Sequence, residues 1–220
     1  MSASVEGARE LVLADGEGVA DLATYVARAR TLDADGAMRL QAVGPVLAAW
    51  VCVVPGQGMM RSGLVLALRT MALHGPHELD VTVPLRSLAD RFARRSATGD
   101  ASTSLPVPPT EVSPQWAGVS PPRGGWEPVG QVSAEALLAA AEHGIEEVAK
   151  GAPDGSGAAA VAMLRARVWA RDIEGGATAG AGLATRALGF ARPGDGQVAT
   201  VHRSGPWTRV SLPAGHVLSR

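Results

Sequence analysis

Histidine and acidic side chains are the residues of this chain that could bind a metal ion. His74, His77 and Glu78 fall within one run, His74-Gly-Pro-His-Glu. The proline in this run predicts an exposed turn, and the sequence offers no further histidine at a spacing typical of zinc sites. His143 lies one helical turn from Glu146, which a solvated helix face explains. We therefore predict no metal site.

Nucleophilic catalysis would need a serine or a cysteine in a recognisable setting. The sequence contains no Gly-x-Ser-x-Gly run, and no catalytic signature surrounds Cys52. An enzyme site would have to be assembled by folding from residues far apart in the chain. The candidates for such a catalytic site are His74, Asp80 and His202.

Glycine-rich loops that bind phosphate are the usual mark of a nucleotide cofactor. The runs Gly56-Gln-Gly58 and Gly175-Gly176 lack the spacing that lets a loop cradle phosphate at the start of a helix. We therefore predict no cofactor.

Candidate binding residues lie in and beside a proline-rich tract. Residues 96–128 are rich in Pro, Ser, Thr and Gly, so this tract cannot form a regular helix or a paired strand. Trp116 and Trp126 within it predict that it lies along a domain surface. Arg94 and Arg95, just before the tract, form a basic edge that could hold an acidic partner, although a solvated helix end also explains them.

Charge and composition limit the classes of partner. The formal net charge is −1 and charged residues make up 19% of the chain, so no strong field attracts nucleic acid or anionic lipid. The longest apolar run, residues 43–54, contains Gly44 and Pro45 and is shorter than the roughly 20 residues that span a bilayer. One cysteine and an N-terminus without a secretory pattern favour a cytoplasmic protein. We predict no nucleic-acid or membrane partner.

The elements that must position these residues follow from hydrophobic periodicity. In the first block, residues 18–30 predict an amphipathic helix capped by Asp15. Residues 37–54 predict two extended segments or one bent strand, 63–73 a strand, and 78–83 a strand with Leu79, Val81 and Val83 on its buried face. A helix is expected from Leu85 to Arg95, after Pro84.

In the second block, Ser133 is expected to cap a helix that runs to about Lys150. Residues 158–173 are ambiguous, because alanine favours a helix whereas the placing of Val161, Val168 and Trp169 favours a strand. Residues 182–191, 197–202 and 207–212 predict strands.

An internal repeat would resolve that ambiguity. An offset of 119 positions places Trp50 on Trp169 and aligns several glycines, including Gly63 with Gly182. An offset of 129 then aligns residues 81–84 with 210–213. Under this duplication residues 158–173 form a strand, and the two tryptophans occupy equivalent, buried positions.

These patterns predict an α+β fold made of two tandem copies of a mainly antiparallel sheet with packed helices, related by a pseudo-two-fold axis. The predicted domains are residues 9–95 and 129–220, joined by the linker 96–128. The composition and the runs Gly63-Leu-Val-Leu-Ala-Leu-Arg, Leu79-Asp-Val-Thr-Val-Pro and Trp207-Thr-Arg-Val-Ser-Leu-Pro resemble a functionally uncharacterised family of actinobacteria. That resemblance implies a bacterial cytosol and no particular activity.

Two functions fit these observations. The first is a non-catalytic binding or assembly protein that holds a protein or a small molecule at the junction of its two repeats, with a homo-oligomer also possible. The alternative is a small-molecule enzyme, a hydrolase or a transferase, whose residues are brought together by folding.

Overall fold

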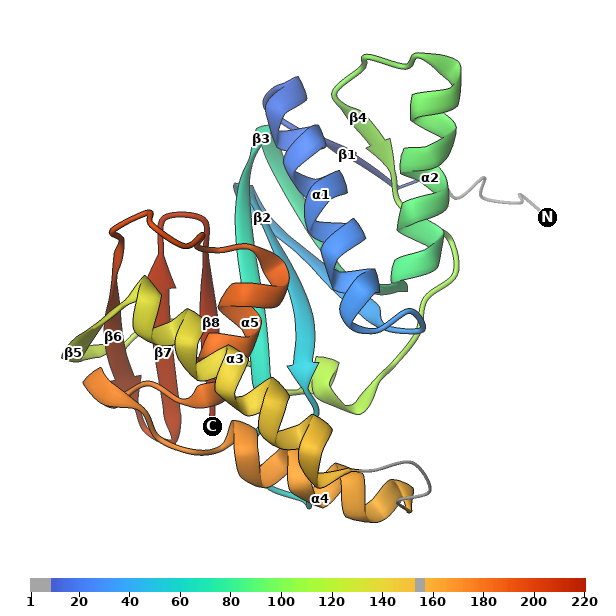
Figure 1. Ribbon diagram of the computed structural model, residues 1–220. Coiled ribbons are helices and arrows are strands. Elements are labelled where there is room, and N and C mark those ends of the chain that lie inside the picture. Colours follow the sequence, from blue (N-terminus) through green and yellow to red (C-terminus); the bar gives the residue numbers. More distant parts are fainter. Residues whose placement is uncertain (1–8, 153–156) are drawn as a thin grey trace. The chain divides into compact units, whose positions relative to one another are not determined.

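The structure is a computed structural model that describes residues 9–152 and 157–220 (Figure 1). Strands and helices follow one another along the chain. Neighbouring strands pair antiparallel, both between residues 10–12 and 104–106 and across the sheet that contains the C-terminal strands. The predicted α+β class with antiparallel pairing is therefore confirmed. The strands are β1 (Glu10–Val12), β2 (Ala37–Val54), β3 (Val65–Pro84), β4 (Ser104–Pro106), β5 (Glu127–Ser133), β6 (Val198–Ser204), β7 (Trp207–Leu212) and β8 (Gly215–Ser219). The helices are α1 (Gly16–Leu32), α2 (Leu85–Thr98), α3 (Ala134–Gly151), α4 (Ala158–Trp169) and α5 (Ala179–Leu188), with the short 3-10 helices η1 (Gln115–Gly118) and η2 (Glu174–Gly176).

Two compact units divide the chain, and long strands contribute residues to both. The described part of the first unit is residues 9–50 and 70–114, and the second unit comprises Val51–Arg69 and Gln115–Arg220 without residues 153–156. β2 and β3 each cross from one unit into the other along the chain. None of the described helices combines the length and the apolar character needed to span a bilayer.

The first unit contains the helices α1 and α2 and the short pair β1 and β4. α1 begins where predicted, because the Asp15 carboxylate accepts a hydrogen bond from the Gly18 amide at 2.7 Å. α2 follows Pro84, as expected, and ends at Gly99, whose φ of 65° is the left-handed conformation that glycine adopts readily. The two helices contact each other.

The two long strands were only partly predicted. β2 is one strand, with Gly44 at a φ of 59°, which agrees with the bent-strand alternative. β3 runs without a break through residues 74–78, so the predicted turn there is wrong. Pro76 fits a strand at this point because β8 pairs with β3 only over residues 65–68, which leaves an edge beyond.

The predicted burial of alternate strand residues is largely confirmed. Val81 and Val83 of β3 are buried, and Leu79 is half-buried. Val210 and Leu212 of β7 are buried as predicted.

In the second unit, β8, β7, β6 and β5 form an antiparallel sheet with helices on one face (Figure 1). Val201, Val210 and Val217 lie side by side across β6, β7 and β8 and are buried. α5 contacts β8 and packs closely against α3, since a Cβ added at Gly182 would come within 2.3 Å of the Leu137 carbonyl oxygen. Ser133 caps α3 as predicted, accepting a hydrogen bond from the Ala136 amide at 3.0 Å.

Two predicted strands of the second unit are helices. Residues 158–169 form α4, and residues 179–188 form α5, which Thr178 caps by accepting a hydrogen bond from the Ala181 amide. The helix propensity of alanine outweighs the placing of the branched residues in α4. In α5 nearly every residue is buried, and a short buried helix has the same apolar character as a buried strand.

The offset of 119 positions therefore does not relate equivalent strands. Trp50 lies in β2 and is half-buried, whereas Trp169 is the last residue of α4 and is buried against Gly144 of α3. Pro84 precedes a helix, while Pro213 lies in the turn between β7 and β8. What the two halves share is their opening order, a strand followed by a side-chain-capped helix, β1–α1 and β5–α3.

Candidate binding site

A polar cluster lies on the sheet face of the second unit that is opposite to its helices. Neighbouring residues of a strand point to opposite faces, so the buried residues Val201, Val210 and Val217 fix the direction of their neighbours. His202 is directly paired with Arg209, and Ser211 is directly paired with His216. These four side chains therefore share one face across three adjacent strands. We call them, together with Trp126, the Arg209 cluster.

Trp126 reaches this face from the segment before β5. The centre of the Arg209 guanidinium lies 4.7 Å from the centroid of the Trp126 ring, which is a cation–π contact. The indole N–H donates to the Pro122 carbonyl at 3.1 Å, and the Ser204 hydroxyl donates to the Gly124 carbonyl at 3.4 Å. Gly125 adopts a φ of 72° between these contacts. The segment is thus fastened against the end of β6, and the indole is held over the arginine.

Burial affects the side chains of Arg209 and His202. It lowers the pKa of the Arg209 guanidinium, although this arginine stays protonated at any physiological pH. Its Nε atom is buried and has no hydrogen-bond partner among the described residues. The Nδ1 atom of His202, on the paired residue, is likewise buried without a partner in the described part of the chain. Two polar atoms on neighbouring strands are therefore left unsatisfied.

His216 is the second imidazole of the cluster. Its Nδ1 atom lies 2.9 Å from the Ser211 hydroxyl. Burial, and to a lesser extent the positive charge of Arg209, lower the pKa of His216 below its ordinary value. The imidazole is therefore neutral at neutral pH and can accept the hydroxyl proton of Ser211.

The cluster carries one permanent positive charge that the described residues do not neutralise, because no described carboxylate forms an ion pair with Arg209. A guanidinium is planar, and stacking against an indole orders it, which suits it to bind a carboxylate or a phosphate. The hydroxyl and the two imidazole side chains add further hydrogen-bonding groups. The arrangement is chemically suited to hold an anionic group.

The predicted catalytic residues are dispersed over both units. His74 is exposed on β3 and lies six positions, roughly 20 Å along an extended strand, from Asp80. Asp80 is held by Arg39 through two hydrogen bonds of 2.7 and 2.6 Å and by Gln41 at 3.0 Å. His202 belongs to the second unit. A shared catalytic role of these three residues stays a prediction, and the pairing of Asp80 with Arg39 does not favour it.

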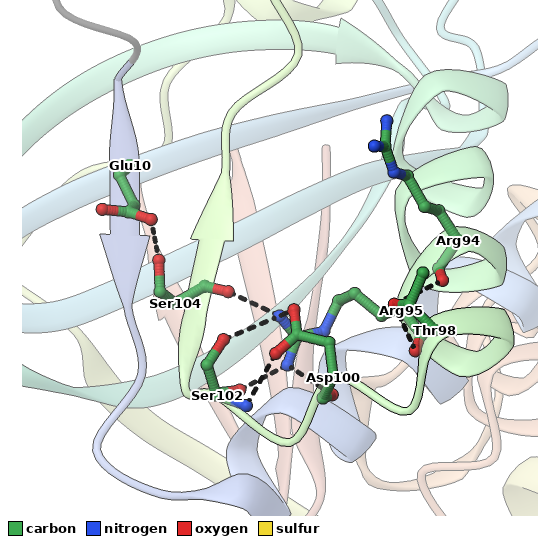
Figure 2. Close-up of polar contacts among 7 residues, drawn as sticks. All are labelled: Glu10, Arg94, Arg95, Thr98, Asp100, Ser102 and Ser104. Carbon is green, nitrogen blue, oxygen red and sulfur yellow. Dashed lines mark hydrogen bonds and ion pairs between the residues drawn. The ribbon is translucent and has the colours of Figure 1, made fainter.

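The predicted binding residues Arg94 and Arg95 differ in their surroundings, as Figure 2 shows. Arg95 donates to the Asp100 carboxylate at 2.8 Å, to the Ser104 carbonyl at 2.7 Å and also to the Ser102 carbonyl. Its side chain is only 11% exposed. The guanidinium of Arg94 is exposed and points away from this network. Arg95 thus holds the chain between α2 and β4, and a binding role for either arginine stays a prediction.

Of the two predicted tryptophans, one belongs to the cluster and one does not. Trp126 stacks on Arg209, whereas Trp116 is half-buried in η1. Sequence reasoning missed Arg209 and Ser211 altogether and gave no role to His216. The alternation of residue types could have indicated this face. Polar residues occupy every second position of two successive strands, Thr200 and His202 on the first and Arg209 and Ser211 on the second.

Within the described residues, no group of three or more His, Cys, Asp or Glu side chains is arranged to hold a metal ion. His77 Nδ1 instead lies 3.0 Å from the Gly75 carbonyl oxygen of its own strand.

Comparison with solved structures finds similar chains at low sequence identity. One is described as a candidate DNA polymerase III beta subunit from Eubacterium rectale, with 8% identity and a TM-score of 0.49 over 96% of this chain. Another is the Caulobacter crescentus pol III beta, with 11% identity and a TM-score of 0.49 over 96% of this chain. This chain spans 64% and 65% of those chains. At such values neither likeness carries a functional inference.

No curated protein matches the sequence. Two family descriptions do, one after the other along the chain. Residues 121–220 match a domain of unknown function, DUF8185. Residues 6–118, more than half of the chain, match the domain of unknown function DUF8010. This agrees with the expected resemblance to an uncharacterised family, and the chain belongs to the DUF8010 family.

Proposed function

We propose that this chain is a non-catalytic binding protein and that the Arg209 cluster holds the anionic group of its ligand. The observation that carries the proposal is the state of Arg209. Its guanidinium is stacked on Trp126, its Nε atom is buried without a partner among the described residues, and no described carboxylate neutralises it.

An unpaired buried donor is costly. Leaving such a group without a hydrogen bond costs about 1 to 3 kcal/mol, and more when the group is charged. A bound anion would supply the missing acceptor and the missing charge together. The unpartnered Nδ1 atom of His202, on the directly paired residue, would gain a partner from the same ligand.

The ligand is expected to be small. The cluster has one permanent cation, and the net charge of the chain is −1, so a polyanion finds no extended positive surface. One carboxylate or one phosphate group matches the single guanidinium, and Trp126 offers an apolar surface for the rest of the molecule.

Isothermal titration calorimetry with inorganic phosphate and with succinate tests this proposal. The unmodified chain should bind at least one of the two anions with a stoichiometry of one, and Arg209→Gln should weaken binding by about tenfold or more. The matched control is Arg203→Gln, which removes the same charge from an exposed position on β6 and should leave the affinity within about twofold. Failure of both anions to bind, or equal losses in the two variants, would refute the proposal.

The hydrogen bond between Ser211 and His216 favours a second function, that of a hydrolase. A neutral imidazole 2.9 Å from a hydroxyl can act as its general base. No described carboxylate orients the other ring nitrogen, so the pair is less complete than a triad. Hydrolysis of p-nitrophenyl acetate by the unmodified chain, with loss of activity in Ser211→Ala, would establish this function in place of pure binding.

Further features stay predictions from the sequence. They are the domain boundaries at residues 9–95, 96–128 and 129–220, an actinobacterial origin, a cytoplasmic location and a homo-oligomeric state. The predicted ligand at the junction of the two halves is a different site from the Arg209 cluster, which lies within the second unit. The consecutive family matches to residues 6–118 and 121–220 support a division into two parts.

A further inference from the structure

The second unit exposes three methionine side chains at neighbouring elements. Met59 is 97% exposed, Met60 is 65% exposed and Met163 is 68% exposed. Isolated exposed apolar residues are ordinary, but a group of large ones marks a surface for association. Methionine is flexible and polarizable, which suits it to binding surfaces that adapt to a partner.

The turn that carries Met59 and Met60 is closely constrained. The Gln57 amide donates to the Ser62 carbonyl at 2.9 Å, and the Ser62 amide donates back to the Gln57 carbonyl at 3.1 Å. Arg61 adopts a φ of 52°, the left-handed region that non-glycine residues rarely occupy. The fold thus holds the two methionines outward at a conformational cost.

α4 continues this surface. The Gln57 side-chain amide donates to the Ala162 carbonyl at 3.5 Å, so the turn lies against the helix (Figure 1). At helical spacing, Ala159, Ala162 and Met163 share an exposed face, while Val168 and Trp169 are buried. The small alanines allow another helix to approach closely. We call the face formed by Met59, Met60, Ala159, Ala162 and Met163 the methionine surface.

The charged residues of the two segments that form the methionine surface are all arginines. Arg61, Arg165 and Arg167 are the only charged residues within residues 55–64 and 158–169. Among the acids of α3, Glu146 pairs with Lys150 and Glu147 pairs with Arg171, and Glu147 also lies close enough to Arg167 for the two charges to attract each other. Arg61 and Arg165 form no ion pair with a carboxylate in the described part of the chain, and these two arginines give the surface a positive rim.

We propose that the methionine surface docks an acidic amphipathic helix of another protein. The partner's apolar face would cover the methionines and alanines, and its carboxylates would face the arginines. A second copy of this chain is disfavoured as the occupant, because it would bring the same arginines against each other. This inference is independent of the Arg209 cluster.

Fluorescence anisotropy with two labelled synthetic helices tests the proposal. Both peptides carry Leu at positions i, i+3, i+4 and i+7, and the remaining positions are Glu in one peptide and Lys in the other. The Glu peptide should bind about tenfold more tightly than the Lys peptide. Met59→Ser and Met163→Ser should each weaken its binding by about fivefold or more. Val43→Ser, at a residue 59% exposed in the first unit, is the control and should leave binding unchanged.

Three results would overturn the proposal. The first is equal or no binding of the two peptides. The second is an equal loss of binding in Val43→Ser. The third is a dimer in sedimentation experiments that dissociates in Met59→Ser and Met163→Ser, because the occupant would then be a second copy.

Discussion

Arg95 in the first unit and Arg209 in the second are both half-buried, but their surroundings differ. The Arg95 guanidinium donates hydrogen bonds to the Asp100 carboxylate and to the carbonyls of Ser102 and Ser104, so it is bound by residues of its own chain (Figure 2). Arg209 is stacked on an indole, and its Nε atom has no partner among the described residues.

This difference separates a structural arginine from a binding arginine. A guanidinium that donates to main-chain carbonyls stabilises the path of a loop, and removing it costs stability. A guanidinium that is desolvated without an acceptor reduces stability until a ligand supplies one. Substitution of the two residues should therefore affect different measurements.

The largest effect is expected from Arg95→Ala. The variant loses the bonds to Asp100, Ser102 and Ser104 and should lower the free energy of unfolding by about 2 to 3 kcal/mol. Chemical denaturation measures this change. Arg94→Ala, one position earlier and exposed, should stay within about 0.5 kcal/mol. An Arg95→Ala variant as stable as the unmodified chain would contradict the structural role of Arg95.

Arg209→Gln should have the opposite profile. Its anion affinity should fall by about tenfold, which corresponds to about 1.4 kcal/mol, while its free energy of unfolding without ligand should be unchanged or higher. Calorimetry and denaturation on the same preparation give both values. A large loss of stability with intact anion binding would make Arg209 a second structural arginine.

Trp126→Leu tests the role of the stacked indole, since it removes the ring while keeping an apolar side chain. Loss of the cation–π contact is expected to cost about 0.5 to 1 kcal/mol of anion affinity, because the guanidinium is less well ordered. Trp116→Leu is the matched control in the same segment and should bind the anion like the unmodified chain. Equal behaviour of the two variants would argue against a role of the stacked indole.

The smallest effect concerns pH. Because the pKa of His216 lies below its ordinary value of 6.5, the unfolded chain takes up this proton at a higher pH than the folded chain. The contribution of His216 to stability is thus constant above pH 6.5 and declines as the pH falls below it. Denaturation curves across this range should show a weaker pH dependence in His216→Gln than in the exposed control His143→Gln. Identical pH dependence in the two variants would contradict the burial of this imidazole.

Much of the fold was predictable from local signals. Asp15 and Ser133 are caps that a sequence displays directly, and the helices α1 and α3 begin at them. The alternation in residues 78–83 and 207–212 correctly placed the buried faces of β3 and β7. These elements were predictable because apolar residues mark one face of each, although Thr82 of β3 and Trp207 of β7 are buried on the opposite faces.

The second unit was harder to predict, since the sequences of its helices α4 and α5 show no clear contrast between an apolar face and a polar face. Nearly every residue of α5 is buried, and only its ends, Thr178 and Gly189, carry a helical signal. The apparent repeat made this worse, because the coincidence of Trp50 with Trp169 imposed a strand on α4.

The candidate site was only partly predictable for a related reason. His202 and Trp126 could be singled out by residue type, but they are 76 positions apart and meet only through Arg209. Antiparallel register brings His202 opposite Arg209 across the hairpin of β6 and β7. This register depends on the short turn at residues 205–206, and the sequence analysis predicted the two strands without their pairing. Whether a charged side chain finds a partner in the fold cannot be read from sequence, so Arg95 was predicted as a binding residue and Arg209 was missed.

The most direct test of the contrast between the two arginines is an NMR titration that follows the Nε–Hε signals of Arg95 and Arg209 together while inorganic phosphate or succinate is added. We expect a saturable shift of the Arg209 signal and of the Trp126 indole N–H signal, and no shift of the Arg95 signal. Equal shifts at both arginines, or a stationary Arg209 signal at anion concentrations that saturate the calorimetric binding curve, would contradict this expectation.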